Sequence, residues 1–214
     1  MRSLIALLGV VFTLSACAQE ATGDYKEGKD YFVLEQPVRT ADPSKIEVAE
    51  VFSYHCPHCL HFEALLQVWE KQQADDVDFV QTHAKWNAQM EPLSRGFYTS
   101  IALKIKDKTH MDAFKAFQVE HKPLATAEDW AEFFSAYGVD KAKAINTYNS
   151  FGVNSMVMQA EARMRSYKVS GTPEMVVEGK YRINANMTGG QGDMLKVVDF
   201  LVAKVRKERA LAKK

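Results

Sequence analysis

The segment Cys56-Pro57-His58-Cys59 lies between a run of residues typical of a strand and a run with helical spacing, and this junction decides the fold. The run before it, Lys45 to Tyr54, is dense in β-branched and aromatic residues, which is typical of a strand. After it, apolar residues recur at helical spacing over about 57–73, with Pro57 in the first turn, where its missing N–H costs nothing. Val77 to Thr82 predicts a further strand of the same sheet. We therefore expect a βαβ unit with the cysteines at the strand-to-helix turn.

The spacing makes this cysteine pair a poor structural clamp. The chain has three cysteines, and only Cys56 and Cys59 are close together. In the chain-entropy account, cross-linking a loop of about four residues gains roughly 2 kcal/mol, against roughly 4.7 kcal/mol for a loop of about 100 residues. The two sulfurs can, however, meet with little backbone movement. The spacing therefore favours a reversible two-electron redox couple.

The start of the predicted helix should make the two thiols unequal. A cysteine there faces unpaired backbone N–H groups and the positive end of the helix dipole, and both favour the thiolate. Cys56 has this place and is the candidate nucleophile, whereas Cys59 is expected to be more buried and to act as the resolving thiol. His58 can donate a hydrogen bond or a charge to the Cys56 sulfur, which makes the disulfide a stronger oxidant. We expect His55 and His61 only to add local polarity.

Other interpretations of the cysteines are weaker. A c-type haem needs His directly after the second cysteine, and Leu60 stands there. Zinc is conceivable because histidines surround the thiols, yet a structural zinc site usually draws ligands from two separate segments. The sequence has no second Cys/His cluster, since His83, His110 and His121 are scattered. We therefore expect no metal, and a purely structural disulfide is also disfavoured.

Between about 88 and 166 the strand signals vanish. Apolar and aromatic residues recur there at helical spacing, and we expect these stripes to be core. Thr126 and Asp140 are expected caps and Gly138 an expected stop. The picture is an α/β sheet interrupted by a helical insertion.

After this insertion the strand signal returns. Glu174–Glu178 and Tyr181–Ile183 are expected to form a hairpin through a tight turn at Gly179-Lys180. The apolar residues between Met194 and Val205 then predict a closing helix.

Residues 1–18 have the pattern of an export signal. A positively charged start precedes the run Leu4–Leu14, which is short for a bilayer span. Cleavage after Ala18 fits the small-residue rule of signal peptidase, whereas Leu14-Ser15-Ala16-Cys17 resembles a bacterial lipobox, in which Cys17 becomes the lipidated first residue. Either route leads to an oxidising compartment.

Composition and charge indicate one ordinary globular domain. Of the 214 residues, 47% are hydrophobic and 25% are charged. The formal net charge is zero, so we expect no nucleic-acid partner. We expect the polar residues 19–30 to form a loose leader, and in a lipidated protein a tether.

Two segments resemble the DsbA family of periplasmic thiol:disulfide oxidoreductases, in the thioredoxin superfamily. Phe52 to Glu63 is similar to that family's active-site segment, and Ser170 to Tyr181 to its cis-proline segment. The combination is highly specific, whereas a bare Cys-x-x-Cys is not. The resemblance covers essentially all of the chain after the leader. It implies an α/β thioredoxin fold in two parts, 19–87 and 167–214, separated by a helical insertion at 88–166 and preceded by the leader 1–18.

The resemblance also implies roles for single residues. It makes Cys56 the attacking thiol, Cys59 its partner and His58 the tuning residue, with Pro57 between them. It makes Pro173 the cis-proline that faces the disulfide, since cis bonds are essentially a proline feature.

The family's buried acid falls on Glu50 and a nearby acid on Glu63. Burial of a carboxylate is costly, and from the sequence either side chain could instead point to solvent. Thr172 departs from the Val of the best-known pattern, which leaves client preference open.

The implied activity is that of a protein-disulfide oxidoreductase, a dithiol oxidase whose only redox group is the Cys56–Cys59 disulfide. Its clients would be newly exported, unfolded proteins with free thiols, and a DsbB-type membrane quinone reductase would reoxidise it. We expect a monomer in the periplasm, with or without a lipid on Cys17. One alternative is a reductase or isomerase, although the residues before Tyr31 are expected to be too few for an isomerase's dimerisation region. The other is a non-catalytic, client-binding lipoprotein.

Overall fold

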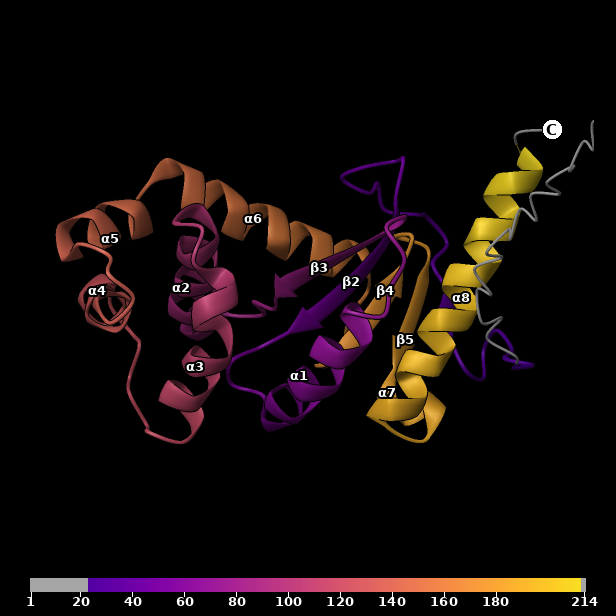
Figure 1. Cartoon of the computed structure of the whole chain (residues 1–214), viewed down its shortest axis with the longest axis horizontal. Helices are drawn as coiled ribbons and strands as arrows, with labels where there is room; N and C mark the ends of the chain where they lie inside the picture. The colour runs from indigo at the N-terminus through magenta and orange to yellow at the C-terminus, as the bar shows by residue number, and fades with distance from the viewer. Residues whose placement is uncertain (1–22, 213–214) are drawn as a thin grey trace, which may run out of the picture.

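The structure is a computed structural model that describes residues 23–212. The expected export signal and Cys17 lie outside the described residues, so both remain predictions. A twisted sheet flanked by helices and a group of further helices make up the described chain (Figure 1).

The sheet has five strands in the order β1-β5-β4-β2-β3. The central strand β2 (Ile46–Phe52) pairs in parallel with β3 (Val77–His83) and antiparallel with β4 (Glu174–Val177). Beyond β4 lie β5 (Tyr181–Asn184) and the short β1 (Phe32–Val33), both antiparallel to their neighbours. All seven residues of β2 are buried, which explains its apolar sequence. Its glutamates are therefore exceptions that need partners.

Helices cover both faces of this sheet. The helices α1 (Pro57–Glu70) and α8 (Gln191–Ala212) pack on one face together with side chains of β2, β4 and β5. The end of α6 (Phe151–Ser166) packs on the other face, against β2 and β4. A single turn, α7 (Ala185–Thr188), links β5 to α8. Figure 1 shows α6 running from the group of further helices to the sheet.

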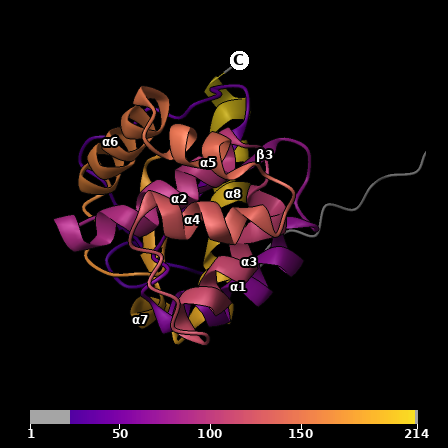
Figure 2. The ribbon, with the colours of Figure 1, turned by 90° about the vertical axis from the view of Figure 1, so that its left-hand side faces the viewer.

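The helical group fills the chain between β3 and α6, and Figure 2 views the molecule from its side. It contains a short 3₁₀ turn (Ala88–Met90), then α2 (Glu91–Ala102), α3 (Lys106–Gln118), α4 (Ala127–Ser135) and α5 (Lys141–Tyr148). That this group forms a separate domain remains a prediction.

The predicted ends of these helices are confirmed. Thr126 caps α4 in a capping box with Asp129, and Asp140 caps α5. Gly138 has a φ of +79°, which suits a helix stop. Gly96 on α2 lies so close to α4 that an added Cβ would stand 1.9 Å from the Trp130 ring.

The aromatic stripes are core, as predicted, and that core reaches the cysteines. One buried cluster holds Phe97, Phe114 and Trp130 of the helical group together with Phe52, Tyr54 and Cys59. The helical group therefore forms part of the wall around the dithiol.

The structure corrects three local expectations. Helix α1 ends at Glu70 and not at 73. The hairpin turn is centred on Glu178 and Gly179, the two residues with positive φ, one position earlier than expected. Part of the expected loose leader is packed, since the Tyr25 ring contacts the Phe200 ring on α8 at 5.3 Å.

Candidate active site

Cys56 and Cys59 lie at the start of α1, as predicted. Cys56 is the N-cap residue with extended backbone, and Pro57 follows in the first turn. Both cysteines are free thiols; Cys56 is partly exposed, whereas Cys59 is fully buried. The backbone N–H of Cys56 donates to the carbonyl oxygen of Ser53 at 2.9 Å, which closes the turn between β2 and α1.

The surroundings of Cys56 favour its thiolate. A hydrogen bond from the Cys59 thiol lowers the pKa of Cys56 from its ordinary value of 9.0 to about 5, against the opposing effect of burial. The side chain of Thr172 and the backbone N–H groups of Cys59 and His58 lower it further. The carbonyl oxygen of Thr172 is 3.2 Å from the Cys56 sulfur and accepts from the neutral thiol.

Cys59 has the opposite tendency. Burial raises the pKa of its thiol far above the ordinary value, and the nearby Cys56 and Glu50 raise it further. At neutral pH the site therefore holds a thiolate at Cys56 beside a protonated Cys59.

Two glutamines from distant parts of the chain brace this turn. The Gln118 side-chain nitrogen, at the end of α3, donates to the carbonyl oxygens of Tyr54 at 2.8 Å and Cys56 at 3.0 Å. The Gln191 side-chain nitrogen, at the start of α8, donates to the carbonyl oxygen of His58 at 2.6 Å. Neither residue can be recognised from the sequence, because a glutamine on a helix gives the same pattern when it faces solvent.

The histidines near the dithiol are exposed on the surface. His58 acts on Cys56 through its backbone N–H, so the tuning role of its imidazole remains a prediction. The His55 ring lies 4.8 Å from the Phe117 ring, and His61 is exposed.

The Thr172-Pro173 bond is cis, as predicted, and it lies beside Cys56. A hollow of about 580 Å³ opens here between the turn that holds His58, the loop before β4 and α7. It is lined by His58, residues 170–174, residues 184–186, Gly190 and Gln191.

Both predicted acids are buried, which excludes the alternative that either side chain points to solvent. Glu50 on β2 is 1% exposed and Glu63 on α1 is 5% exposed. The side-chain nitrogen of Gln81 lies between them, 2.9 Å from Glu50 and 3.2 Å from Glu63. Burial, and then the charge of Glu63, raise the pKa of Glu50 well above its ordinary value.

Glu63 stays ionised because it has a basic partner. Burial alone would raise its pKa, but His110 at 3.3 Å and further hydrogen bonds lower it below the ordinary value. His110 also contacts the Tyr54 hydroxyl at 2.8 Å, and Lys106 donates to the Gln81 side-chain oxygen at 3.1 Å.

This network corrects the view that the other histidines are scattered. His83 and His110 are both buried against Tyr54, and the His83 ring accepts from the Tyr54 backbone N–H at 3.2 Å. Burial lowers the pKa of His83 to about 3. No periodicity places these residues together, because they come from β3 and α3.

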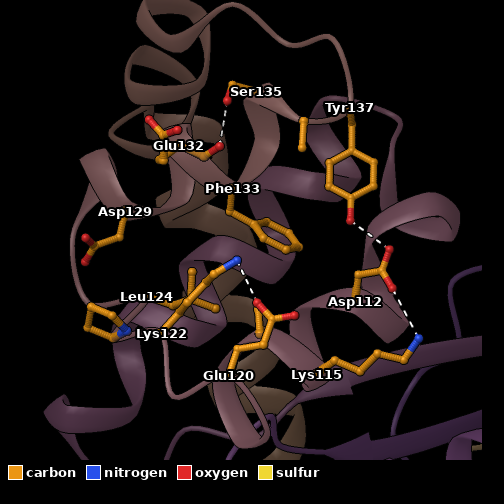
Figure 3. A pocket seen from close by; sticks show the side chains of 13 residues that line it. Asp112, Lys115, Glu120, Lys122, Leu124, Asp129, Glu132, Phe133, Ser135 and Tyr137 are labelled. Carbon is orange, nitrogen blue, oxygen red and sulfur yellow. Dashed lines mark hydrogen bonds and ion pairs between the residues drawn. The ribbon is translucent and has the colours of Figure 1, made fainter.

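Another hollow, of about 620 Å³, lies in the helical group between α3 and α4. Four of its charged side chains form pairs, Asp112 with Lys115 and Glu120 with Lys122, and the Tyr137 hydroxyl donates to Asp112 (Figure 3). It offers no nucleophile comparable with the dithiol.

Within residues 23–212, no group of three or more His, Cys, Asp or Glu side chains is arranged to hold a metal ion. The helices in that range are also too short or too polar to cross a membrane.

Known proteins resemble this chain along its whole length. The sequence model of the DSBA-like thioredoxin domain matches residues 84–201. The thiol:disulfide interchange protein DsbA of Pseudomonas aeruginosa is 39% identical over 100% of both chains. That of Azotobacter vinelandii is 36% identical over 96% of this chain and 99% of its own.

Solved structures agree with these sequence matches. The crystal structure of Pseudomonas aeruginosa DsbA superposes with a TM-score of 0.82 at 40% identity, covering 89% of this chain and 98% of that one. The oxidoreductase DsbA of Xylella fastidiosa gives a TM-score of 0.81 at 30% identity, covering 86% of this chain and 98% of that one.

Proposed function

This chain belongs to the DsbA family of thiol:disulfide interchange proteins, and on that premise we propose that it oxidises exported proteins by donating the Cys56–Cys59 disulfide. The observation that carries the proposal is the inequality of the two thiols. The pKa of Cys56 is lowered to about 5 and that of Cys59 is raised. A stabilised thiolate favours the reduced enzyme, so the disulfide form is a strong oxidant.

The reaction has two exchange steps. A client thiolate attacks the Cys56 sulfur, the Cys56–Cys59 bond breaks, and Cys59 leaves with the electron pair. A second client thiolate then attacks the client sulfur of the mixed disulfide and displaces Cys56 as a thiolate. The client loses two electrons to the dithiol and gains a disulfide.

Glu50 is the proposed proton source in the first step. The departing Cys59 sulfur lies in a buried site where its thiolate is disfavoured, so it must take up a proton. Glu50 lies close enough to raise the pKa of Cys59, and its own pKa is raised by burial. A protonated carboxyl group in this place can supply the proton.

The segment around Pro173 is the proposed docking strip for the client. Residues 170–174 line the hollow beside the dithiol, and an extended client segment could pair with their backbone. His58 borders the same hollow and is proposed to tune the potential.

The family resemblance supports a proposal for the location and the reoxidant. We propose a periplasmic enzyme with a DsbB-type quinone reductase as its reoxidant, and we propose that it is a monomer. If Cys17 is lipidated, the tether is shorter than expected, because the Tyr25 ring already packs against Phe200. Mass spectrometry of the mature N-terminus tests this, and an unmodified Gln19 start would end the lipoprotein hypothesis.

The redox equilibrium of the dithiol with glutathione tests the oxidase direction. A potential near that of thioredoxin, about −270 mV, would instead indicate a reductase. A peptide-oxidation assay should show no activity for Cys56→Ser. Cys59→Ser is the matched variant. Its Cys56 thiolate should attack oxidised glutathione, release one reduced glutathione, and accumulate as the mixed disulfide because the resolving thiol is missing.

A further inference from the structure

Glu174 is a buried carboxylate that the mechanism above does not use. It is the first residue of β4, directly follows Pro173, and is 2% exposed. Burial of a carboxylate is costly unless hydrogen bonds and charges compensate it. The groups that compensate Glu174 therefore indicate what it does.

One carboxylate oxygen closes the loop before the proline. Glu174 Oε1 accepts from the backbone N–H of Ser170 at 3.2 Å, from that of Gly171 at 3.1 Å and from the Ser170 hydroxyl at 3.4 Å. Hydrogen bonds from several donors to a charged acceptor are strong, so the carboxylate fixes this short loop.

The second oxygen is held from the neighbouring strand. Glu174 Oε2 lies 3.5 Å from Arg182 Nε on β5, and the Arg182 guanidinium lies over the Phe32 ring at 4.9 Å. Within residues 23–212, both Glu174 Oε2 and Arg182 Nε lack a hydrogen-bond partner. The attraction between the two charges thus orients the carboxylate, while its other oxygen accepts the hydrogen bonds from the loop.

The loop that Glu174 fixes leads directly to Thr172, whose carbonyl oxygen is 3.2 Å from the Cys56 sulfur. We propose that Glu174 is a positioning residue for Cys56, which holds Ser170 and Gly171 so that Thr172 stays against the sulfur. The inference rests on the proposed function only in taking Cys56 as the reacting thiol. The carbonyl oxygen can accept only from the neutral thiol, whereas the Thr172 side chain lowers the pKa of Cys56. A displaced loop that carries this side chain away should therefore weaken the preference for the thiolate.

Two substitutions separate position from charge. Glu174→Gln keeps an oxygen that can accept from the loop but removes the charge. Glu174→Asp keeps the charge but shortens the side chain, so it cannot reach the same donors. Glu174→Ala removes both. The measurements are the apparent pKa of Cys56, from thiolate absorbance of the reduced protein, and the glutathione equilibrium of the full chain.

Glu174→Asp and Glu174→Ala should raise the Cys56 pKa by about one unit and make the equilibrium about tenfold less oxidising. Glu174→Gln should stay within about twofold of the wild type, which is roughly 0.3 of a pKa unit. The matched control is Glu178→Ala, which removes another glutamate of the same hairpin, paired with Arg209, and should leave Cys56 unchanged.

Two results would overturn the inference. If Asp and Ala lower the melting temperature but leave the Cys56 pKa at its wild-type value, Glu174 is merely structural. If Gln shifts the pKa as far as Ala does, the charge and not the position acts on Cys56. If Ala does not fold, the Asp and Gln pair still decides. A wild type that fails to oxidise clients would end the proposed function without touching this comparison, which needs only the reduced dithiol.

Discussion

Gln118 donates a hydrogen bond to the backbone carbonyl oxygen of Cys56 across 62 positions of sequence. The same nitrogen also donates to the carbonyl oxygen of Tyr54. The last turn of α3 therefore holds the backbone from which the reactive sulfur projects.

Gln118→Ala should destabilise the protein by about 1–2 kcal/mol, because two carbonyl oxygens lose their donor. For a chain of this size that corresponds to a melting temperature lower by roughly 2–8 °C. Alkylation of Cys56 should change as well. Gln159→Ala is the control, since among residues 23–212 that side chain bonds only to Ser155 on the surface of α6. Equal effects of the two substitutions would contradict the bracing role.

Reduction should stabilise the fold in a pH-dependent way. The pKa of Cys56 is about 5 in the folded reduced protein and ordinarily 9.0. Between these pH values the unfolded chain binds a proton that the folded chain lacks, so the free energy of unfolding rises with pH. The disulfide form lacks this titration. The melting temperature of the reduced form should therefore exceed that of the oxidised form at neutral pH, and the gap should shrink as the pH falls toward about 5. A gap that does not vary over this range would refute the low pKa.

Glu50→Gln should stabilise the protein at neutral pH. The pKa of Glu50 is raised above its ordinary 4.5, so its contribution to stability is lost as the pH rises through the folded value. The amide keeps an acceptor for Gln81 and cannot ionise in either the folded or the unfolded chain. We expect a gain of about 1 kcal/mol, or roughly 2–4 °C in melting temperature, which grows from acid toward neutral pH. Client oxidation should slow, because Cys59 loses its proton source.

The matched control for Glu50 is another buried glutamate of the same strand. Glu47 pairs with Arg163 and accepts from the Tyr167 hydroxyl. Glu47→Gln should therefore cost about 2 kcal/mol, since it breaks a charged hydrogen bond. If both substitutions changed the free energy of unfolding in the same direction, the pairing of each carboxylate would not decide its effect.

Gly96→Ala should be among the most damaging small substitutions in the helical group. Its Cβ would stand 1.9 Å from the Trp130 ring, and overpacking of this kind costs about 1–3 kcal/mol. Gly152→Ala on α6 is the control, because the nearest atom outside its helix backbone is 3.8 Å away. That change should stabilise the helix by about 0.5–1 kcal/mol. Chemical unfolding of both variants tests the pair, and an unaffected Gly96→Ala would contradict the close contact.

Most of the fold can be predicted from the sequence, because the patterns that indicate its strands, helices and caps involve neighbouring residues. The apolar run before Cys56 and the helical spacing after it predict β2 and α1 from neighbouring residues alone. The caps at Thr126 and Asp140 are equally local, since each hydrogen bond spans three positions. Glu50 and Glu63 could be proposed only through the family resemblance.

The remainder of the site is made by contacts between distant segments. Gln118 and His110 each act on a group supplied by another element, and nothing in their own neighbourhood marks them. A polar side chain on a helix has the same sequence pattern whether it faces water or reaches across a buried interface. The pairing of helix faces has to be known before such residues can be named.

The buried cluster that joins Phe114 and Trp130 to Phe52 and Cys59 has a consequence for engineering. The helical group is no detachable cap, because its aromatic rings pack in the same cluster as the resolving thiol. A chimera that exchanged these helices for those of a relative would have to repack the surroundings of Cys59 as well. Grafting α2 to α5 alone would therefore change the redox potential of the dithiol as well as the surface of the protein.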